Sequence, residues 1–254
     1  EREEQNAWEE DLLASSVDGI GWIIKSRRES FLPTFDAMLK PFVLPLLQLP
    51  LPHLAVSMPP SQLSFGLCLS IDILEHCGDG GRRSIFGALM PVLFQGCADG
   101  TPSSIRQACA YGLGVAADHG GEEFDAYSAE AFRLLLGLVE QGRRVVEEDM
   151  EEDYDVISCV TDNAVSAALR MVSAATTVDD CLTPAVGILL RMLPLRSDVI
   201  EARDCHRRVV DILCCGNRVL MNRERGDGDV GIGYVPELVR ALAGMMAYQP
   251  SPEE

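Results

Sequence analysis

The chain has 254 residues, of which 47% are hydrophobic and 24% are charged, so it can bury a large core and is unlike a disordered protein. Its formal net charge of −18 argues against binding to nucleic acid or to an anionic membrane surface, because both require clustered lysine and arginine. A basic partner is the electrostatic match, although a large net charge also serves solubility alone.

Helical spacing of apolar residues begins near the first residue. Trp8, Leu12, Leu13, Ile20 and Ile23 predict an opening helix. No basic and apolar signal segment precedes it, and the first residue is a glutamate rather than a methionine. We therefore expect a soluble piece of a longer chain.

The most apolar stretch, residues 41–60, contains several prolines. Pro41, Pro45, Pro50 and Pro52 interrupt it, so it cannot form one uninterrupted membrane-spanning helix. The following segments repeat helical spacing, with proline before some of them and glycine after others. The predicted helices cover residues 61–77, 83–97, 102–119, 124–142, 155–175, 182–194, 197–215 and 234–247.

Two of these helices end in related sequences, "EHCG" at 75–78 and "DHGG" at 118–121, which lie 43 residues apart. A helix, a turn and a second helix occupy the interval, which is the period of HEAT and armadillo arrays. The pattern predicts an all-α fold, an α-solenoid of antiparallel helix pairs. We expect residues 1–254 to form a single array of about five to six repeats.

Small residues support this arrangement. Gly112 and Gly114 stand in the middle of the helix predicted for 102–119, where each glycine costs roughly 0.5–1 kcal/mol relative to alanine. Together with Ala110 they would let the second helix of a neighbouring repeat approach closely. A coincidence of small residues in a helical bundle is the alternative.

Sequence motifs give little support to catalysis, a cofactor or a metal. "GLGVAA" at 112–117 matches a dinucleotide fingerprint only formally, because it lies inside a helix rather than between a strand and a helix. The nine cysteines form no CxxC pair and look like free thiols, and His76 beside Cys77 is too little for a zinc site. We expect neither an enzyme nor a bound cofactor or metal ion.

Two segments look like loops. A glycine- and aspartate-rich stretch at 226–231 resembles a linker between repeats. The run at 147–155 lacks the glycine and glutamate that a calcium loop requires, and we expect it to be an exposed loop between helices, either merely solvated or a surface for a basic partner. Its acidic residues are Glu147, Glu148, Asp149, Glu151, Glu152, Asp153 and Asp155.

Four blocks carry a resemblance to a known family: "GLCLSIDILEHCG", "IRQACAYGLGVAADHGG", "TDNAVSAALRMV" and "LLRMLPLRSDVIEA". In this order and at these separations they resemble the C-terminal HEAT repeats of the importin-beta (karyopherin-beta) nuclear transport receptors, closest to the importin-5 or karyopherin beta 3 branch. The similarity covers roughly residues 60 to 215 well and the flanks weakly. The acidic run at 147–155 and the loop at 226–231 depart from the family pattern.

The resemblance implies a carrier of basic cargo, such as ribosomal proteins and histones, between cytoplasm and nucleus. Such carriers cross the nuclear pore on phenylalanine-glycine nucleoporins and release cargo when the GTPase Ran binds in its GTP form. Ran binds mainly through N-terminal repeats that this chain lacks. The family's second helices line the concave face, and acids there would contact cargo. Carried over by position, these acids are Asp72, Glu75, Asp118, Asp162, Asp204 and Asp211.

Each of these acids could equally be an ordinary solvated helix residue. A HEAT-repeat scaffold that assembles other proteins without a transport cycle is the alternative function. The fragment alone could also lack transport activity, because the N-terminal repeats are absent.

Overall fold

The computed structural model describes residues 2–48, 59–98, 100–147, 151–174, 182–214 and 235–248. Every regular element in these ranges is helical, which confirms the all-α prediction. The glycine- and aspartate-rich stretch predicted as a linker, residues 226–231, lies entirely outside the described residues. Contacts divide the chain into two compact units, Glu1–Ala131 and Phe132–Glu254.

The first unit begins with a long helix, α1 (Arg2–Arg27). Short helical turns follow it: η1 (Arg28–Phe31), α2 (Leu32–Thr34), η2 (Phe35–Leu39) and α3 (Lys40–Leu46). Two of these pieces carry a proline in their first turn, where its missing amide hydrogen is tolerated. The predicted interruption at Pro41 and Pro45 is wrong, because α3 contains both prolines and ends only at Leu46. Pro50 and Pro52 lie outside the described residues.

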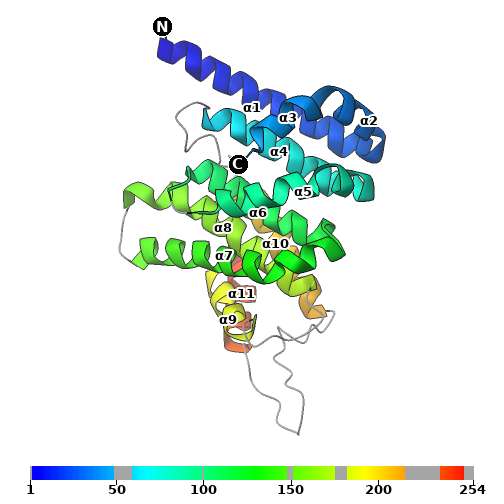
Figure 1. Cartoon of the computed structure of the whole chain (residues 1–254). Coiled ribbons are helices and arrows are strands. Elements are labelled where there is room, and N and C mark those ends of the chain that lie inside the picture. The colour runs from blue at the N-terminus through cyan, green and yellow to red at the C-terminus, as the bar shows by residue number, and fades with distance from the viewer. Residues whose placement is uncertain are drawn as a thin grey trace. The chain divides into compact units, whose positions relative to one another are not determined.

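Three helices of regular length complete the core of the first unit. They are α4 (Pro60–His76), α5 (Gly78–Gly96) and α6 (Ser103–His119), and α7 (Glu122–Glu147) begins after them. The helix α4 packs against both α1 and α6 (Figure 1). Its side chains Leu63, Leu67 and Leu74 are fully buried, so this helix forms the centre of the unit.

Glycines end two of these helices as the sequence predicts. Gly78 follows α4 with a φ of 57°, and Gly121 follows α6 with a φ of 59°. A side chain is disfavoured in this left-handed conformation, which explains glycine at both positions. After Gly78 the chain enters α5 at once, so the predicted start at residue 83 is several residues too late.

The helix α1 differs from its prediction in the face that it buries. Ile24 is fully buried, and Leu13 and Ile20 are half-buried. Trp8 and Ile23, which the spacing places with the apolar set, are instead 64% and 50% exposed. The helix therefore carries apolar residues on two sides, and only one side packs on the unit.

In its described residues, the second unit contains the rest of α7 and four further helices. They are α8 (Glu151–Ala174), α9 (Leu182–Met192), α10 (Val199–Cys214) and α11 (Val235–Ala247). The helix α8 packs against α9 and α10, and α9 packs against α11. None of the helices in the described ranges is long and apolar enough to cross a membrane.

Candidate functional site

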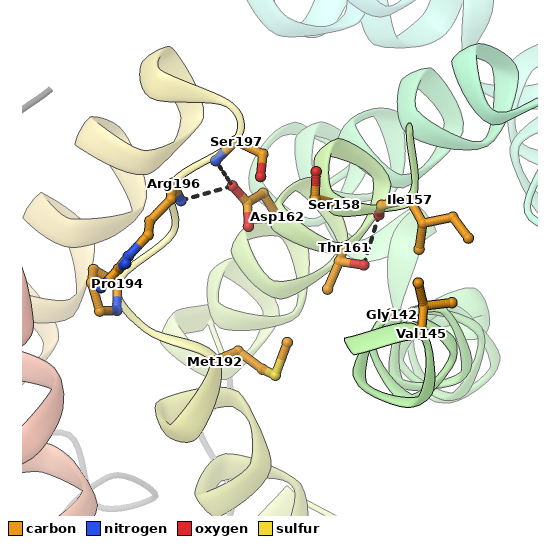
Figure 2. A pocket seen from close by; sticks show the side chains of 10 residues that line it. All are labelled: Gly142, Val145, Ile157, Ser158, Thr161, Asp162, Met192, Pro194, Arg196 and Ser197. Atoms are coloured by element: carbon orange, nitrogen blue, oxygen red, sulfur yellow. Dashed lines mark hydrogen bonds between the residues drawn. The ribbon is translucent and has the colours of Figure 1, made fainter. Parts of the chain in front are cut away.

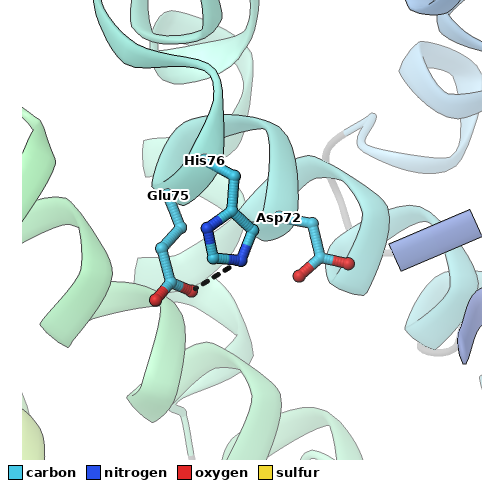
Figure 3. A group of neighbouring side chains, drawn as sticks. All are labelled: Asp72, Glu75 and His76. Carbon is cyan, nitrogen blue, oxygen red and sulfur yellow. Dashed lines mark ion pairs between the residues drawn. The ribbon is translucent and has the colours of Figure 1, made fainter. Parts of the chain in front are cut away.

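A half-buried group of polar side chains forms on the last turns of α4. Asp72, Glu75 and His76 follow the spacing i, i+3, i+4, which places them on one side of the helix. Figure 3 shows the His76 imidazole between the two carboxylates. One possible ligand atom from each residue lies within 4.8 Å of the other two.

Neighbouring helices hold both carboxylates in place. On α6, the Tyr111 hydroxyl donates a hydrogen bond of 2.8 Å to Oε2 of Glu75. On α1, the backbone of Gly21 comes so close that a Cβ atom there would lie 2.7 Å from Oδ2 of Asp72. The carboxylates are thus enclosed by helices that are distant in sequence.

Burial, as the larger cause, and the adjacent Glu75 carboxylate raise the pKa of Asp72 from 3.8 to about 7. Lys25 on α1 acts in the opposite direction on this pKa, and Asp18 adds to the rise. Because the pKa of Asp72 stays high despite Lys25, the negative charge of this group is incompletely compensated. An additional cation would stabilise the ionised form of Asp72.

His76 supplies a neutral group rather than a compensating charge. Its Nε2 lies 3.9 Å from Oε2 of Glu75, and the His76 and Glu75 side chains are 18% and 22% exposed. Burial lowers the pKa of His76 from 6.5, although Glu75 opposes this shift. Burial therefore favours the neutral form of the imidazole.

This arrangement offers two kinds of chemistry. Two carboxylates and a neutral imidazole are a donor set that could hold a divalent cation. The same carboxylate oxygens can accept charge-assisted hydrogen bonds from a lysine or arginine side chain. The sequence analysis considered only His76 and Cys77 as possible metal ligands in this segment. The Cys77 thiol is not part of the group, because it donates a hydrogen bond of 3.3 Å to the carbonyl oxygen of Arg28.

The remaining predicted acids are dispersed. Asp118 is exposed in the last turn of α6. In the second unit, Asp204 and Asp211 are exposed on α10, where a separation of seven residues places them on one side of the helix. Within the first unit, the structure thus brings Asp72 and Glu75 together and leaves Asp118 at the surface.

Asp162 is buried and accepts hydrogen bonds from the backbone of its own unit. It is 8% exposed on α8, and its Oδ2 accepts backbone N–H groups from Arg196, Ser197 and Asp198 at 3.0, 2.7 and 3.1 Å. These three N–H groups lie just before α10, so no carbonyl group within a helix can accept their hydrogen bonds. Asp162 fixes the connection between α9 and α10, which leaves this oxygen little capacity for a partner protein.

The acidic run at 147–155 is mostly helical, which corrects the predicted loop. Glu147 is the last residue of α7, and Glu151, Glu152, Asp153 and Asp155 lie in the first turns of α8. Acidic residues are favourable there because the N-terminus of a helix carries a partial positive charge. The residues between the helices, Glu148 and Asp149 among them, lie outside the described residues.

A small cavity of about 110 Å³ lies in the second unit, between α7, α8 and the connection from α9 to α10 (Figure 2). Thr161, Met192 and Pro194 contribute to its wall, as does Asp162. Pockets for drug-sized ligands measure roughly 300–1,000 Å³, so this cavity is suited to a few water molecules.

The second unit also contains a buried polar network that the sequence analysis did not predict. Arg170 on α8 forms an ion pair of 3.0 Å with Glu201 on α10, and the Ser166 hydroxyl donates to the same carboxylate. Asp198 accepts the backbone N–H of Glu201 at 3.0 Å and an N–H of Asn163 at 3.0 Å. The network joins α8 to α10 and has a structural role.

No model of a known protein family matches this sequence.

Proposed function

We propose that the helices form an array of antiparallel HEAT-type pairs. Gly78 and Gly121, which end α4 and α6, share the left-handed backbone conformation at positions 43 residues apart. The second helix of each proposed pair contacts the next one within its unit, α4 with α6 and α8 with α10. Gly112 supports close packing, because a Cβ atom there would lie 2.9 Å from Ile71 of α4.

We further propose that the chain is the C-terminal part of a nuclear import receptor that binds basic cargo proteins. The observation that carries this proposal is the pair of half-buried carboxylates, Asp72 and Glu75, on a second helix of the array. Their incompletely compensated charge favours a lysine or arginine side chain, and the net charge of −18 attracts basic segments from a distance.

Cargo of this kind includes ribosomal proteins and histones. Nucleoporins with phenylalanine-glycine repeats and the GTPase Ran are the other proposed partners, the latter mainly through N-terminal repeats. The protein would then move between cytoplasm and nucleus through the nuclear pore. It would perform this work by binding alone, without catalysis.

Fluorescence anisotropy of a labelled lysine-rich nuclear-localisation peptide tests the cargo site. We expect binding that weakens with added salt and weakens about tenfold in the double variant Asp72→Asn, Glu75→Gln. The matched control is Glu122→Gln with Asp125→Asn, which removes two exposed acids at the start of α7. Circular dichroism checks that all variants stay folded.

Equal weakening in both double variants would mean that general charge, rather than this pair, attracts the peptide. Absence of binding at low salt would contradict a cargo site in these repeats and favour the scaffold function.

A further inference from the structure

The polar group on α4 combines a nitrogen donor with two carboxylates. Asp72, Glu75 and His76 each offer one ligand atom, and these three atoms lie within 4.8 Å of one another. Figure 3 shows the imidazole between the carboxylates, where both acids can share an ion with its ring nitrogen. The motifs of the sequence do not predict a metal ion, because they do not show that these three side chains meet. The helix brings together a mixed donor set rather than acids alone.

The two carboxylates of this group lack a basic partner. In the part of the chain that the structure describes, no lysine or arginine forms an ion pair with Asp72 or Glu75. Lys25 of α1 is exposed and does not offset the effect of burial, since the pKa of Asp72 stays at about 7 in its presence. Partly buried carboxylates are costly unless a proton or a cation neutralises them.

Neighbouring helices orient one ligand and leave space beside another. The Tyr111 hydroxyl of α6 donates a hydrogen bond of 2.8 Å to Oε2 of Glu75. Outer hydrogen bonds of this kind are a regular feature of metal sites, where they fix the direction of a ligand and raise the affinity for the ion. On α1, any side chain at Gly21 would crowd Asp72, because a Cβ atom there would lie 2.7 Å from Oδ2.

The donor types select the kind of ion. Calcium and magnesium take shells of oxygen ligands, whereas an imidazole nitrogen is typical of zinc and similar transition metal ions. Nε2 of His76 and Oε2 of Glu75 are 3.9 Å apart. Ligand atoms on a tetrahedral zinc ion lie roughly 3.4 Å apart, so side-chain movements of about 1 Å bring these donors to bonding distance.

We propose that Asp72, Glu75 and His76 bind one divalent transition metal ion of the zinc type. The His76 and Glu75 side chains are 18% and 22% exposed, so solvent reaches the group and a water molecule fills the fourth position of the ion. The ion uses the carboxylate oxygens that the proposed cargo site offers to lysine, so ion and cargo exclude each other there. That exclusion rests on the proposed function, whereas the metal site does not.

Cobalt(II) is the probe, because its absorption reports the type of ligand. The full chain is titrated with cobalt chloride at about pH 7.5 and in roughly a hundredfold excess of Mg²⁺, which saturates any sites that attract divalent ions by charge alone. We expect one Co²⁺ per chain with weak visible bands, which disappear when Zn²⁺ displaces it. No peptide is present, so the result is independent of cargo binding.

Variants identify the ligands. Asp72→Asn and His76→Gln are each expected to weaken Co²⁺ binding by at least about tenfold, and Tyr111→Phe, which removes the outer hydrogen bond, by about tenfold. The matched control is Glu122→Gln, which neutralises an exposed acid at the start of α7 and should leave binding unchanged. Circular dichroism checks that each variant is folded.

Nuclear magnetic resonance of the imidazole nitrogens gives a second readout on the wild-type chain. The sequence has four histidines, which are His53, His76, His119 and His206. Zn²⁺ is expected to shift the ring nitrogen signals of His76 and to leave those of the other three in place. This readout remains decisive even where a variant is destabilised.

Several results would overturn the proposal. The nine cysteines are the main competing ligands, and intense thiolate charge-transfer absorption in the near ultraviolet without the visible bands would assign the metal to them. Loss of binding in excess Mg²⁺ would reveal only diffuse attraction to an acidic chain. Unchanged affinity in His76→Gln, or unshifted His76 nitrogens in saturating Zn²⁺, would remove the imidazole from the site.

Discussion

Asp72 links the stability of the first unit to pH. Its pKa is about 7 in the folded chain and near 3.9 in an unfolded one, so between these values the folded state holds a proton that the unfolded state has lost. The free energy of unfolding therefore falls as pH rises from 4 through 7. Asp72→Asn, which stays neutral, is expected to be more stable than the wild type at pH 8 by about 1–3 kcal/mol.

Urea unfolding of both proteins at pH 4.5 and pH 8 measures this difference. The advantage of the variant should fall to about a quarter of its size at the lower pH, where the unfolded carboxyl is still mostly ionised. Asp118→Asn serves as the control, since it removes an exposed acid from α6. Identical pH profiles of stability for the wild type and Asp72→Asn would refute the raised pKa of Asp72 in the folded state.

Gly112 and Gly87 test the close packing around α6. A Cβ atom at Gly112 would lie 2.7 Å from Leu93 and 2.9 Å from Ile71, whereas one at Gly87 would meet nothing within 4 Å. Both glycines lie inside helices, where alanine is intrinsically better by roughly 0.5–1 kcal/mol. We expect Gly87→Ala to stabilise by about that amount and Gly112→Ala to destabilise by about 1–3 kcal/mol. Thermal unfolding compares them, and stabilisation by both would show that the space at Gly112 is not limiting.

At the scale of elements, the ion pair between Arg170 and Glu201 couples α8 to α10. Removing one partner leaves a buried charge unpaired, so Arg170→Met is expected to destabilise the second unit by about 3–5 kcal/mol. The double variant Arg170→Met, Glu201→Leu should lose less than the single variant. Denaturant unfolding of a double-mutant cycle measures this, and additive losses would contradict the coupling.

The sequence predicts the existence and order of most helices because their apolar spacing is regular and glycine or proline marks many ends. The left-handed glycines at 78 and 121 are the clearest case. The buried face of α1 could not be predicted, since a helix with apolar residues on two sides gives no signal of which side packs. The run of acids at 147–155 predicted an exposed loop, but residues 151–155 form the start of α8. The prediction was wrong there because acidic residues are also favourable at the N-terminus of a helix.

The candidate site was predictable only in part. The spacing of Asp72 and Glu75 places them on one side of a helix, but their enclosure depends on Tyr111 and Gly21, which come from other helices. Asp162 shows the limit most clearly. Its backbone partners lie 34 to 36 residues further along the chain, and no local pattern reveals them.

At the scale of the whole molecule, 39 acidic residues against 21 basic ones create self-repulsion in the folded chain. Salt screens this repulsion, with a Debye length that falls from about 30 Å at 0.01 M to about 8 Å at 0.15 M. The melting temperature is expected to rise by a few degrees, on the order of 2–5 °C, over this range. Calorimetry in sodium chloride and choline chloride measures it, and a melting temperature that falls in both salts would contradict the prediction.

The central claim is that Asp72 and Glu75 together receive a cationic side chain of a partner. Binding of a lysine-rich peptide should ionise Asp72, whose pKa of about 7 leaves it partly protonated at pH 7. Titration calorimetry in phosphate and in Tris, which differ in ionisation enthalpy, counts the protons released. The account predicts release of about half a proton per complex in the wild type and none in Asp72→Asn. Binding without proton release in the wild type would contradict it.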